Sequence, residues 1–297
     1  MTAVSTRAST SVEAVTVEAL AKVNLSLHVV GRRADGYHLL DSLIAFAGVG
    51  DTLIAVPADG FSLTVGGPTA TLLPPGEVNI VEKAARALAA AASLRPDAAL
   101  SLTKRLPVAA GIGGGSADAA AALKALVRLW KLDLPEADLL ALGLKLGADV
   151  PVCLAGRATT LSGIGEGLTP APKLPPAWLV LVNPMQSCST PAVFKARQGP
   201  FSTSMPLLRA PIDAADLAAE LACRRNDLTE PAIGLVPVIG DALALIGGQT
   251  GCLLARMSGS GATCFGLFAG RADADAAAAA LSRARPDWWV AGAELVG

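Results

Sequence analysis

Alternating apolar and polar residues mark the first regular element of the chain. Between positions 22 and 29, every odd position is apolar and every even position is polar. This period of two predicts a strand with one buried face, and it places Lys22 and Asn24 together on the polar face. Asp35 and Gly36 form the turn signal of the loop that follows.

Later segments alternate between strand-like and helix-like patterns. An i, i+3, i+4, i+7 stripe of Leu123, Leu126, Val127 and Trp130 predicts an amphipathic helix that begins near Ser116. Further strands are expected over 42–49, 51–58, 99–104, 178–183, 262–269 and 288–295, and further helices over 79–92, 135–146, 213–222, 236–246 and 271–284.

Proline and glycine punctuate this pattern. The helix over 135–146 stops at Gly147 and leaves Asp149 beyond its end, and Pro151 disfavours a helical conformation at Val150. Four prolines among positions 170–176 indicate a domain boundary. We therefore predict an α+β protein with a tail over 1–13, one domain over 14–168 and a second over 169–297.

Composition excludes several classes of protein. The chain has 297 residues, 52% of them hydrophobic and 16% charged, with a net charge of −1. Neither a long basic run nor a long uninterrupted apolar run occurs, so we expect neither nucleic-acid binding nor a membrane span. The first 14 residues lack the apolar core of a secretory signal. Five scattered cysteines without a CxxC pair, and only two histidines, argue against disulfides and zinc and favour a reducing compartment.

The chain concentrates its glycines in "AAGIGGGSADAAAAL", which starts at Ala109. A P-loop would need a lysine where Ser116 stands, and a dinucleotide fingerprint would need a third glycine there. Two interpretations remain open. Glycine N–H groups and a helix N-terminus could cradle a phosphate, with the Ser116 hydroxyl on a phosphate oxygen or its metal. Alternatively, the glycines could form a tight turn that allows close helix packing.

The neighbouring residues favour the phosphate cradle. "KRLPVAAGIGGGSADAA" resembles the phosphate-binding motif of the GHMP kinases. "AKVNLSLHVVGRRADGYH", "LGADVPVCLAG" and "SGSGATCFGLF" resemble one branch of that superfamily, and the likeness extends over nearly the whole chain from Val15. Two departures are visible. Ala109 and Ala110 replace glycines, which should matter little if both keep a negative φ, and Ala117 replaces a second serine.

The resemblance implies a two-domain GHMP kinase fold: an N-terminal α/β domain, a C-terminal α/β-plait-like domain and an active site in the cleft between them. It implies transfer of a phosphoryl group from ATP, with Mg²⁺, to the 2-hydroxyl of CDP-methylerythritol, in the non-mevalonate route to isoprenoid precursors. The enzyme would be cytoplasmic, as a monomer or homodimer. Other GHMP kinases that act on mevalonate, homoserine or a sugar, and a non-catalytic nucleotide-binding relative, are the alternatives.

The resemblance also assigns residues. Lys22 and Asp149 would be catalytic: Asp149 would accept the proton of the hydroxyl, and Lys22 would orient it. Tyr37 would stack on the cytosine while His38 bonds its edge. The remaining substrate contacts would be Asn24, Thr190 and Phe194, and the ATP contacts would be Lys104, Pro107, Val108, Ala109, Ala110, Gly111, Ile112, Gly113, Gly114, Gly115, Ser116 and Ala117.

Three assignments stay open at this stage. Lys104 could equally be a surface lysine. The stretch Ser258–Ala262 could bring backbone donors to the substrate diphosphate, or it could be a flexible loop. The tripeptide Asn226-Asp227-Leu228 matches one in the family, and no chemical role for it follows from the sequence.

Overall fold

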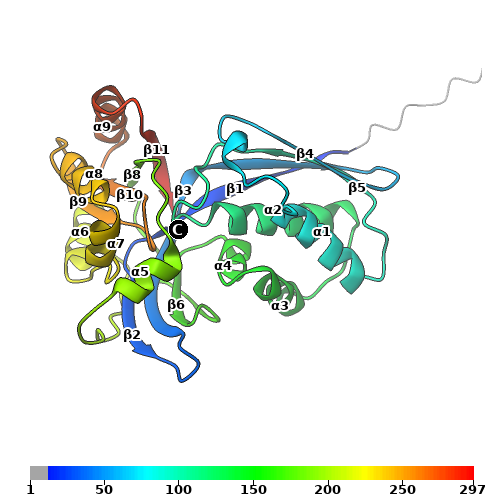
Figure 1. Cartoon of the computed structure of the whole chain (residues 1–297), viewed down its shortest axis with the longest axis horizontal. Coiled ribbons are helices and arrows are strands. Elements are labelled where there is room, and N and C mark those ends of the chain that lie inside the picture. Colours follow the sequence, from blue (N-terminus) through cyan, green and yellow to red (C-terminus); the bar gives the residue numbers. More distant parts are fainter. Residues whose placement is uncertain (1–12) are drawn as a thin grey trace, which may run out of the picture.

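The computed structural model describes residues 13–297, and Figure 1 shows their arrangement. The expected tail over 1–13 lies outside the described residues, except for Glu13. The strands are β1 Val15–Asn24, β2 His28–Arg32, β3 His38–Val56, β4 Phe61–Gly66, β5 Ala98–Thr103, β6 Thr159–Gly163, β7 Gly167–Pro170, β8 Trp178–Asn183, β9 Cys252–Met257, β10 Cys264–Phe268 and β11 Trp289–Val296. The α-helices are α1 Ile80–Ala91, α2 Gly114–Leu129, α3 Glu136–Leu146, α4 Val150–Ala155, α5 Thr190–Ala196, α6 Ala214–Ala222, α7 Thr229–Leu235, α8 Val238–Gly247 and α9 Arg271–Ala284, and the short 3₁₀ helix η1 covers Ala70–Leu72.

The strand β3 organises the first half of the chain. It pairs antiparallel with β1, β2, β5 and β6, while β4 adds to β5 in parallel. The two strands expected over 42–49 and 51–58 are therefore one strand of 19 residues. The glycine at 50 is not a turn, because β3 continues through it and the pairing with β1 shifts register there instead.

The first strand is more deeply buried than its alternation predicts. From Ala21 to Asn24 every residue of β1 is buried, so the expectation of one solvated face is wrong there. Lys22 and Asn24 do share a face, as expected. That face is covered by other polar groups of the molecule, because both side chains have hydrogen-bond partners at that depth.

Helices α1 to α4 gather beside the sheet formed by β1, β3, β4 and β5 (Figure 1). The helix expected from Ser116 is α2, which begins two residues earlier and packs against β1, β3, α1 and α4. The structure corrects the expectation at Val150, which is helical as the first residue of α4. Pro151 is tolerated there because the N–H groups of a helix's first turn have no intrahelical acceptor.

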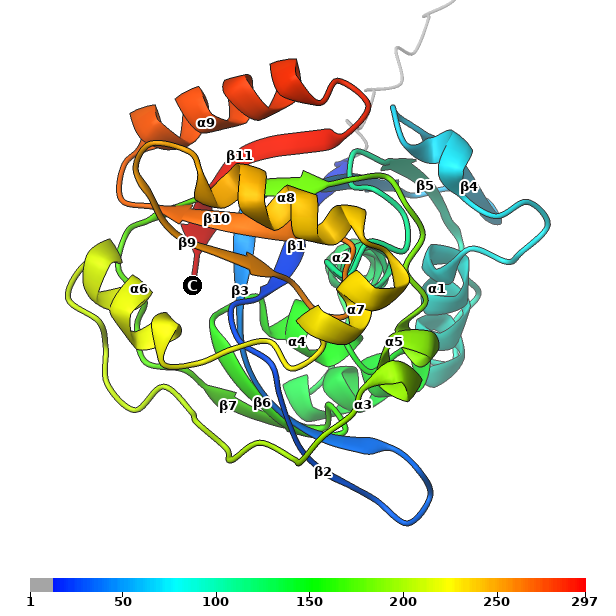
Figure 2. The same ribbon diagram turned by 60° about the vertical axis from the view of Figure 1, so that its left-hand side comes forward.

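The second half is a four-stranded antiparallel sheet in the order β11-β8-β10-β9. Numbered along the chain, this is the order 4-1-3-2 of the ferredoxin-like plait, which confirms the α/β-plait-like fold. Helices α8 and α9 cover one face of this sheet, where Val180 and Val182 point, and α6 packs on the other face with Leu179 and Leu181. Figure 2 shows α8 in front of β10 and α9 running alongside β11.

The two halves are connected through β11. Its residues Leu295 and Val296 pair with Ala47 and Phe46 of β3, which joins all strands into one sheet of eleven. One buried cluster also draws side chains from both halves, including Val23, Leu106 and Ile112 from the first and Leu181 and Phe265 from the second. The predicted boundary between residues 168 and 169 falls within β7 and stays a prediction. The α+β class and the two-part architecture are as expected.

Candidate active site

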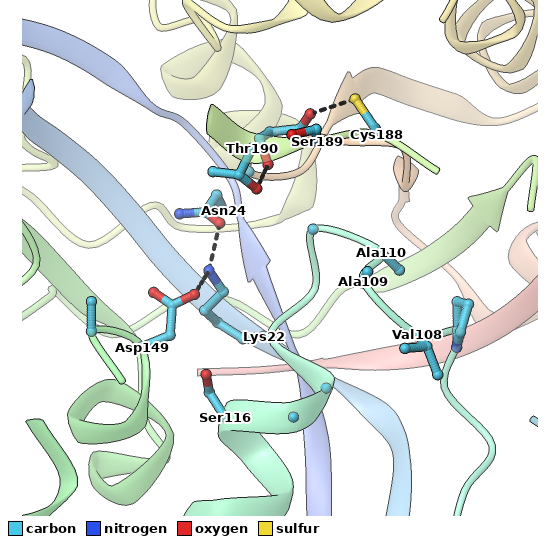
Figure 3. A pocket seen from close by; sticks show the side chains of 18 of the residues that line it. Lys22, Asn24, Val108, Ala109, Ala110, Ser116, Asp149, Cys188, Ser189 and Thr190 are labelled. Atoms are coloured by element: carbon cyan, nitrogen blue, oxygen red, sulfur yellow. Dashed lines mark hydrogen bonds and ion pairs between the residues drawn. The ribbon is translucent and has the colours of Figure 1, made fainter. Parts of the chain in front are cut away.

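A cavity of about 750 Å³ lies where the two halves meet, bordered by β1, the N-terminus of α2, α5 and the loop between β9 and β10 (Figure 3). Fifteen of the residues singled out in the sequence line it: Lys22, Asn24, Lys104, Pro107, Val108, Ala109, Ala110, Gly111, Gly113, Gly114, Gly115, Ser116, Asp149, Thr190 and Phe194. The lining does not include Tyr37, His38, Ile112 and Ala117.

The most polar part of the cavity is a hydrogen-bonded trio. Lys22 Nζ donates to Asp149 Oδ2 at 2.9 Å and to Asn24 Oδ1 at 3.0 Å (Figure 3). The Lys22 side chain is only 5% exposed, whereas that of Asp149 is 37% exposed. The pair therefore presents one accessible carboxylate whose position is held from behind by a buried ammonium group.

Asn24 is itself held in place on three sides. Its Nδ2 donates to Ser42 Oγ at 2.8 Å, and its backbone N–H donates to Ser258 Oγ at 3.0 Å. The third contact of Asn24 is the bond from Lys22 Nζ. The backbone N–H of Lys22 in turn donates to the carbonyl of Ile112, in the glycine segment, at 3.0 Å. The trio is thus fixed to β3, to the loop after β9 and to the glycine segment.

The glycines of the segment 111–115 serve two different purposes. Gly111 has a φ of +73°, and a Cβ atom there would lie 2.5 Å from the carbonyl oxygen of Gly261. Gly113 has a φ of +64°, with its Cβ position 3.3 Å from Lys22. These two glycines are required by packing and by the backbone. At Gly114 and Gly115 the nearest atoms lie at 3.8 and 4.0 Å, so these two leave room on the cavity side.

The alanine at 109 does not meet the condition of a negative φ. Ala109 has a φ of +52°, the left-handed region that favours glycine. For an L-residue this conformation costs about 1–2 kcal/mol. Ile112 and Ala117 are buried at 0% and 2% exposure, so only their backbone could contribute to a ligand site.

The segment ends in the N-terminus of α2, whose first residues are Gly114, Gly115 and Ser116. The first N–H groups of a helix lack intrahelical acceptors, and the helix dipole adds positive potential there. Together with the space beside the two open glycines, this end of α2 suits an anion such as a phosphate group.

Lys104 is not a surface residue. It is 2% exposed, and its ammonium group pairs with the buried carboxylates of Asp51 and Asp118. Burial lowers the pKa of Lys104, but the two carboxylates outweigh this effect and raise it. Burial raises the pKa of Asp118 to about 7, and the nearby Asp51 carboxylate adds to the rise against the opposing charge of Lys104. Among the described residues, Asp118 Oδ1 has no hydrogen-bond partner.

Aromatic rings lie at one edge of the cavity. The imidazole of His38, the first residue of β3, stacks on Phe194 of α5 with ring centroids 5.1 Å apart. Burial, helped by the charges of Arg32 and Arg197, lowers the pKa of His38, so the ring is neutral near pH 7. Tyr37 precedes it at the end of the β2–β3 hairpin and is 64% exposed. The structure brings His38 and Phe194 together and leaves the Tyr37 ring in solvent.

The loop between β9 and β10 forms a further wall of the cavity and packs on the glycine segment. Gly259 and Ser260 line the cavity, and Ser260 Oγ lies 2.6 Å from the Thr190 hydroxyl. Cys188 Sγ donates to the Ser260 carbonyl at 3.3 Å. These contacts anchor the loop and argue against the flexible alternative for Ser258–Ala262, whereas its contact with the substrate diphosphate stays a prediction.

Sequence reasoning missed several side chains that support this site. Ser42 holds Asn24, Asp51 and Asp118 hold Lys104, and Asn79 lines the cavity while its Oδ1 accepts from Val81 N–H at the start of α1. The residues Ser42, Asp51 and Asp118 give no spacing pattern in the sequence, because their partners are 14 to 53 positions away. Within residues 13–297, no group of three or more His, Cys, Asp or Glu side chains is arranged to hold a metal ion.

Comparison with known proteins defines the class first. The protein-family model of the GHMP kinases N terminal domain matches residues 79–157. The family model of the GHMP kinases C terminal domain matches residues 205–287. These segments contain the glycine segment, Asp149 and the loop after β9. The protein is a kinase with the GHMP kinase fold.

Individual relatives show to which branch of the GHMP kinases the chain belongs. The chain is 63% identical over 280 residues to a 4-diphosphocytidyl-2-C-methyl-D-erythritol kinase of Paramagnetospirillum magneticum, covering 94% of this chain and 98% of the relative. It is 58% identical over 297 residues to the one of Rhodospirillum rubrum, covering 100% and 96%. A crystal structure of 4-(cytidine 5'-diphospho)-2C-methyl-D-erythritol kinase matches with a TM-score of 0.80 at 36% identity, over 95% of this chain and all of that one. The chain belongs to the 4-diphosphocytidyl-2-C-methyl-D-erythritol kinase family of the GHMP kinases.

Proposed function

We propose that this protein transfers the γ-phosphoryl group of ATP to the 2-hydroxyl of 4-diphosphocytidyl-2-C-methyl-D-erythritol, giving the 2-phosphate and ADP. The observation that carries the proposal is one cavity with three parts: the Lys22–Asp149 pair, the open glycines at the start of α2, and the His38–Phe194 stack at the edge. These parts suit a reacting hydroxyl, a phosphate chain and a nucleobase. The names of the relatives supply the particular acceptor.

Phosphoryl transfer depends on alignment and on neutralising charge. The substrate hydroxyl would attack the γ-phosphorus of ATP while the bond to the β-phosphate oxygen breaks, and its proton would pass to Asp149. Asp149 is suited to this role because its carboxylate is partly exposed while Lys22 fixes its direction. The Lys22 ammonium would orient the hydroxyl and offset the charge that grows on the transferred group.

The ATP phosphates would lie against residues 107–117. Gly114 and Gly115 leave space, and the N–H groups at the start of α2 supply donors. Lys104 would support this surface without bonding a phosphate directly, because its ammonium group is already paired with the carboxylates of Asp51 and Asp118. Ser116 lines the cavity with a hydroxyl oxygen, the hard type of donor that Mg²⁺ prefers, so Ser116 and phosphate oxygens would hold the ion. When bound, Mg²⁺ neutralises charge on the phosphates.

The cytidine end of the acceptor would enter at the aromatic edge. Phe194 offers one ring face, and Tyr37, next to His38 in the chain, would cover the opposite face of a cytosine. A neutral His38 can both donate and accept a hydrogen bond, which is what the edge of cytosine requires. Asn24 and Thr190, which line the same cavity, would contact the erythritol end and the diphosphate.

The cellular setting forms part of the proposal. The five cysteines, all within residues 13–297, are unpaired thiols, which fits a reducing cytoplasm where ATP is available. No helix in the described part of the chain is long and apolar enough to span a membrane. We propose a cytoplasmic enzyme that acts as a monomer or homodimer.

An ADP-release assay with purified protein tests the function directly. We expect turnover with ATP and 4-diphosphocytidyl-2-C-methyl-D-erythritol, and little above background with mevalonate, homoserine or galactose. Preference for one of those three acceptors would identify a different GHMP kinase. Binding of ATP without turnover of any acceptor would favour the non-catalytic alternative.

A further inference from the structure

The tripeptide Asn226-Asp227-Leu228, which had no role from the sequence, reaches the active site, because Leu228 lines the cavity while Asn226 and Asp227 do not. It sits just before α7 and forms a bridge with Leu27, in the turn between β1 and β2. Leu27 N–H donates to the Arg225 carbonyl and Asp227 N–H donates to the Leu27 carbonyl, both at 2.9 Å. These bonds fix the backbone of the tripeptide to the strand that carries Lys22 and Asn24.

The Asn226 side chain is buried at 6% exposure, and every polar group on it is used. Its Nδ2 donates to the carbonyl of Met257 and to that of Gly259, each at 2.8 Å. Its Oδ1 accepts from Leu228 N–H at 2.9 Å, which fixes the orientation of the amide. One amide group therefore holds the two carbonyls on either side of Ser258.

Ser258 is the residue whose position this arrangement determines. Its hydroxyl accepts from Asn24 N–H at 3.0 Å and donates to the Gly111 carbonyl at 3.2 Å. A single hydroxyl thus connects the strand that carries Lys22 and Asn24 to the segment that would hold the phosphates. There is little slack around it, because a Cβ atom on Gly259 would lie 2.8 Å from the Gly111 carbonyl oxygen.

From this chain of contacts we infer that Asn226 is a positioning residue for phosphoryl transfer, acting through Ser258. It does not line the cavity that contains Lys22 and Asp149. Its amide sets the Ser258 hydroxyl, and that hydroxyl sets the distance between the acceptor side and the phosphate side of the site. Small errors in such a distance are costly, since a misplacement of about 1 Å can reduce a rate about 100-fold. The inference rests on the roles proposed above for Lys22, Asp149 and the glycine segment.

A double-mutant cycle on kcat tests the inference. Asn226→Asp keeps the shape of the side chain but replaces the donating amide with a carboxylate oxygen, which would face the two carbonyl oxygens without a proton. Ser258→Ala removes the connecting hydroxyl. We expect each single variant to lower kcat about 10- to 100-fold. Because both changes break the same connection, the double variant should be no slower than the slower single variant.

Asp227→Asn is the matched control. Asp227 Oδ2 accepts from Val29 N–H of β2 at 2.7 Å and from the Ser202 hydroxyl, so this neighbour holds β2 and the segment around Ser202 and makes no hydrogen bond to Ser258. We expect this variant to lose thermal stability but to keep its kcat. A purely structural role for Asn226 would make Asn226→Asp and Asp227→Asn behave alike, with a lower unfolding temperature and unchanged kcat.

Two kinetic results would overturn the inference: unchanged kcat in folded Asn226→Asp, or multiplicative losses in the double variant. If Asn226→Asp does not fold, Asn226→Ala takes its place in the cycle, because alanine removes the amide without adding charge. Calorimetric titration with ATP separates this question from the identity of the acceptor. We expect several-fold weaker ATP binding in Asn226→Asp even if the wild-type enzyme prefers another acceptor, and unchanged ATP affinity would count against the inference.

Discussion

Lys22 Nζ lies 2.9 Å from Asp149 Oδ2, although 127 positions separate the two residues in the chain. The ammonium group is buried in β1 and the carboxylate is accessible at the start of α4, so the contact directs one carboxylate oxygen and leaves the other free to meet a ligand. This asymmetry is what a general base needs, because the group must be both fixed and reachable.

Replacing Asp149 by asparagine should separate catalysis from binding. In Asp149→Asn the side-chain carbonyl can still accept a bond from Lys22, so the cavity should keep its shape, but the amide cannot take up a proton at neutral pH. We expect kcat to fall by at least about 100-fold, the low end of the contribution of a positioned base. Calorimetric ATP affinity should stay within a few-fold of that of the wild type. Turnover close to the wild-type rate would remove Asp149 from the mechanism.

The two kinds of glycine in the segment 111–115 should respond differently to substitution. Gly111→Ala would put a Cβ atom 2.5 Å from a backbone oxygen at a φ of +73°, and we expect a loss of unfolding free energy of about 1–3 kcal/mol or more. Gly114→Val meets no atom nearer than 3.8 Å at its Cβ, so the protein should fold while ATP binding weakens. Thermal unfolding and ATP titration of both variants make the comparison. Unchanged ATP affinity in Gly114→Val would mean that this glycine also serves packing alone.

Asp118 should give the enzyme an unusual dependence of stability on pH. Its pKa is raised to about 7 in the folded protein, so between about pH 4 and pH 7 the folded state holds a proton that the unfolded state releases. The unfolding free energy should therefore fall as pH rises through this interval, by at most about 1.4 kcal/mol per pH unit. Asp118→Asn abolishes this titration. The unfolding free energy of the variant minus that of the wild type should therefore be larger at about pH 8 than at about pH 5. Urea unfolding at both pH values measures the difference, and parallel pH profiles would contradict the assignment.

The aromatic edge should control affinity for the acceptor and spare that for ATP. Tyr37→Ala would remove a stacking face worth about 0.5–1.5 kcal/mol beyond burial, which should raise KM for the cytidine substrate by several-fold or more. Tyr37→Phe keeps the ring and should be much milder. Steady-state kinetics with each substrate varied in turn provides the test. A raised KM for ATP with an unchanged KM for the acceptor would mean that the two substrate positions are reversed.

The sequence anticipated the elements of this molecule better than their contacts. Period-two and period-3.6 patterns located most strands and helices, and they put Lys22 and Asn24 on one face correctly. They divided β3 in two, because a glycine at 50 resembles a break when the partner strand that continues through it is unknown. The sequence patterns also failed to predict α4. The rule that disfavours a helical residue before a proline does not consider that the first turn of a helix tolerates proline.

The candidate site was found through motif resemblance, and its supports were not. Lys22 and Asp149 carry no local signal of a shared function, and only matching stretches around each brought them together. Ser258 was recognised as part of a serine-glycine stretch, but its bonds to Asn24 and Gly111 depend on tertiary packing over 234 and 147 positions. The burial of Lys104 could not be predicted either, since no pattern in the sequence indicates that its ammonium group pairs with Asp51 and Asp118.

The pairing of β11 with β3 has a consequence for how the molecule is made. Ribosomes synthesise β3 early, but its neighbours Leu295 and Val296 emerge only after every other described element. Until then the nascent chain exposes an unpaired strand edge at Ala47 and Phe46, in the middle of what becomes a continuous sheet. Unpaired strand edges invite contact with other chains. The protein should therefore depend on chaperone protection late in translation, and chains stalled before residue 289 should aggregate more readily than full-length chains.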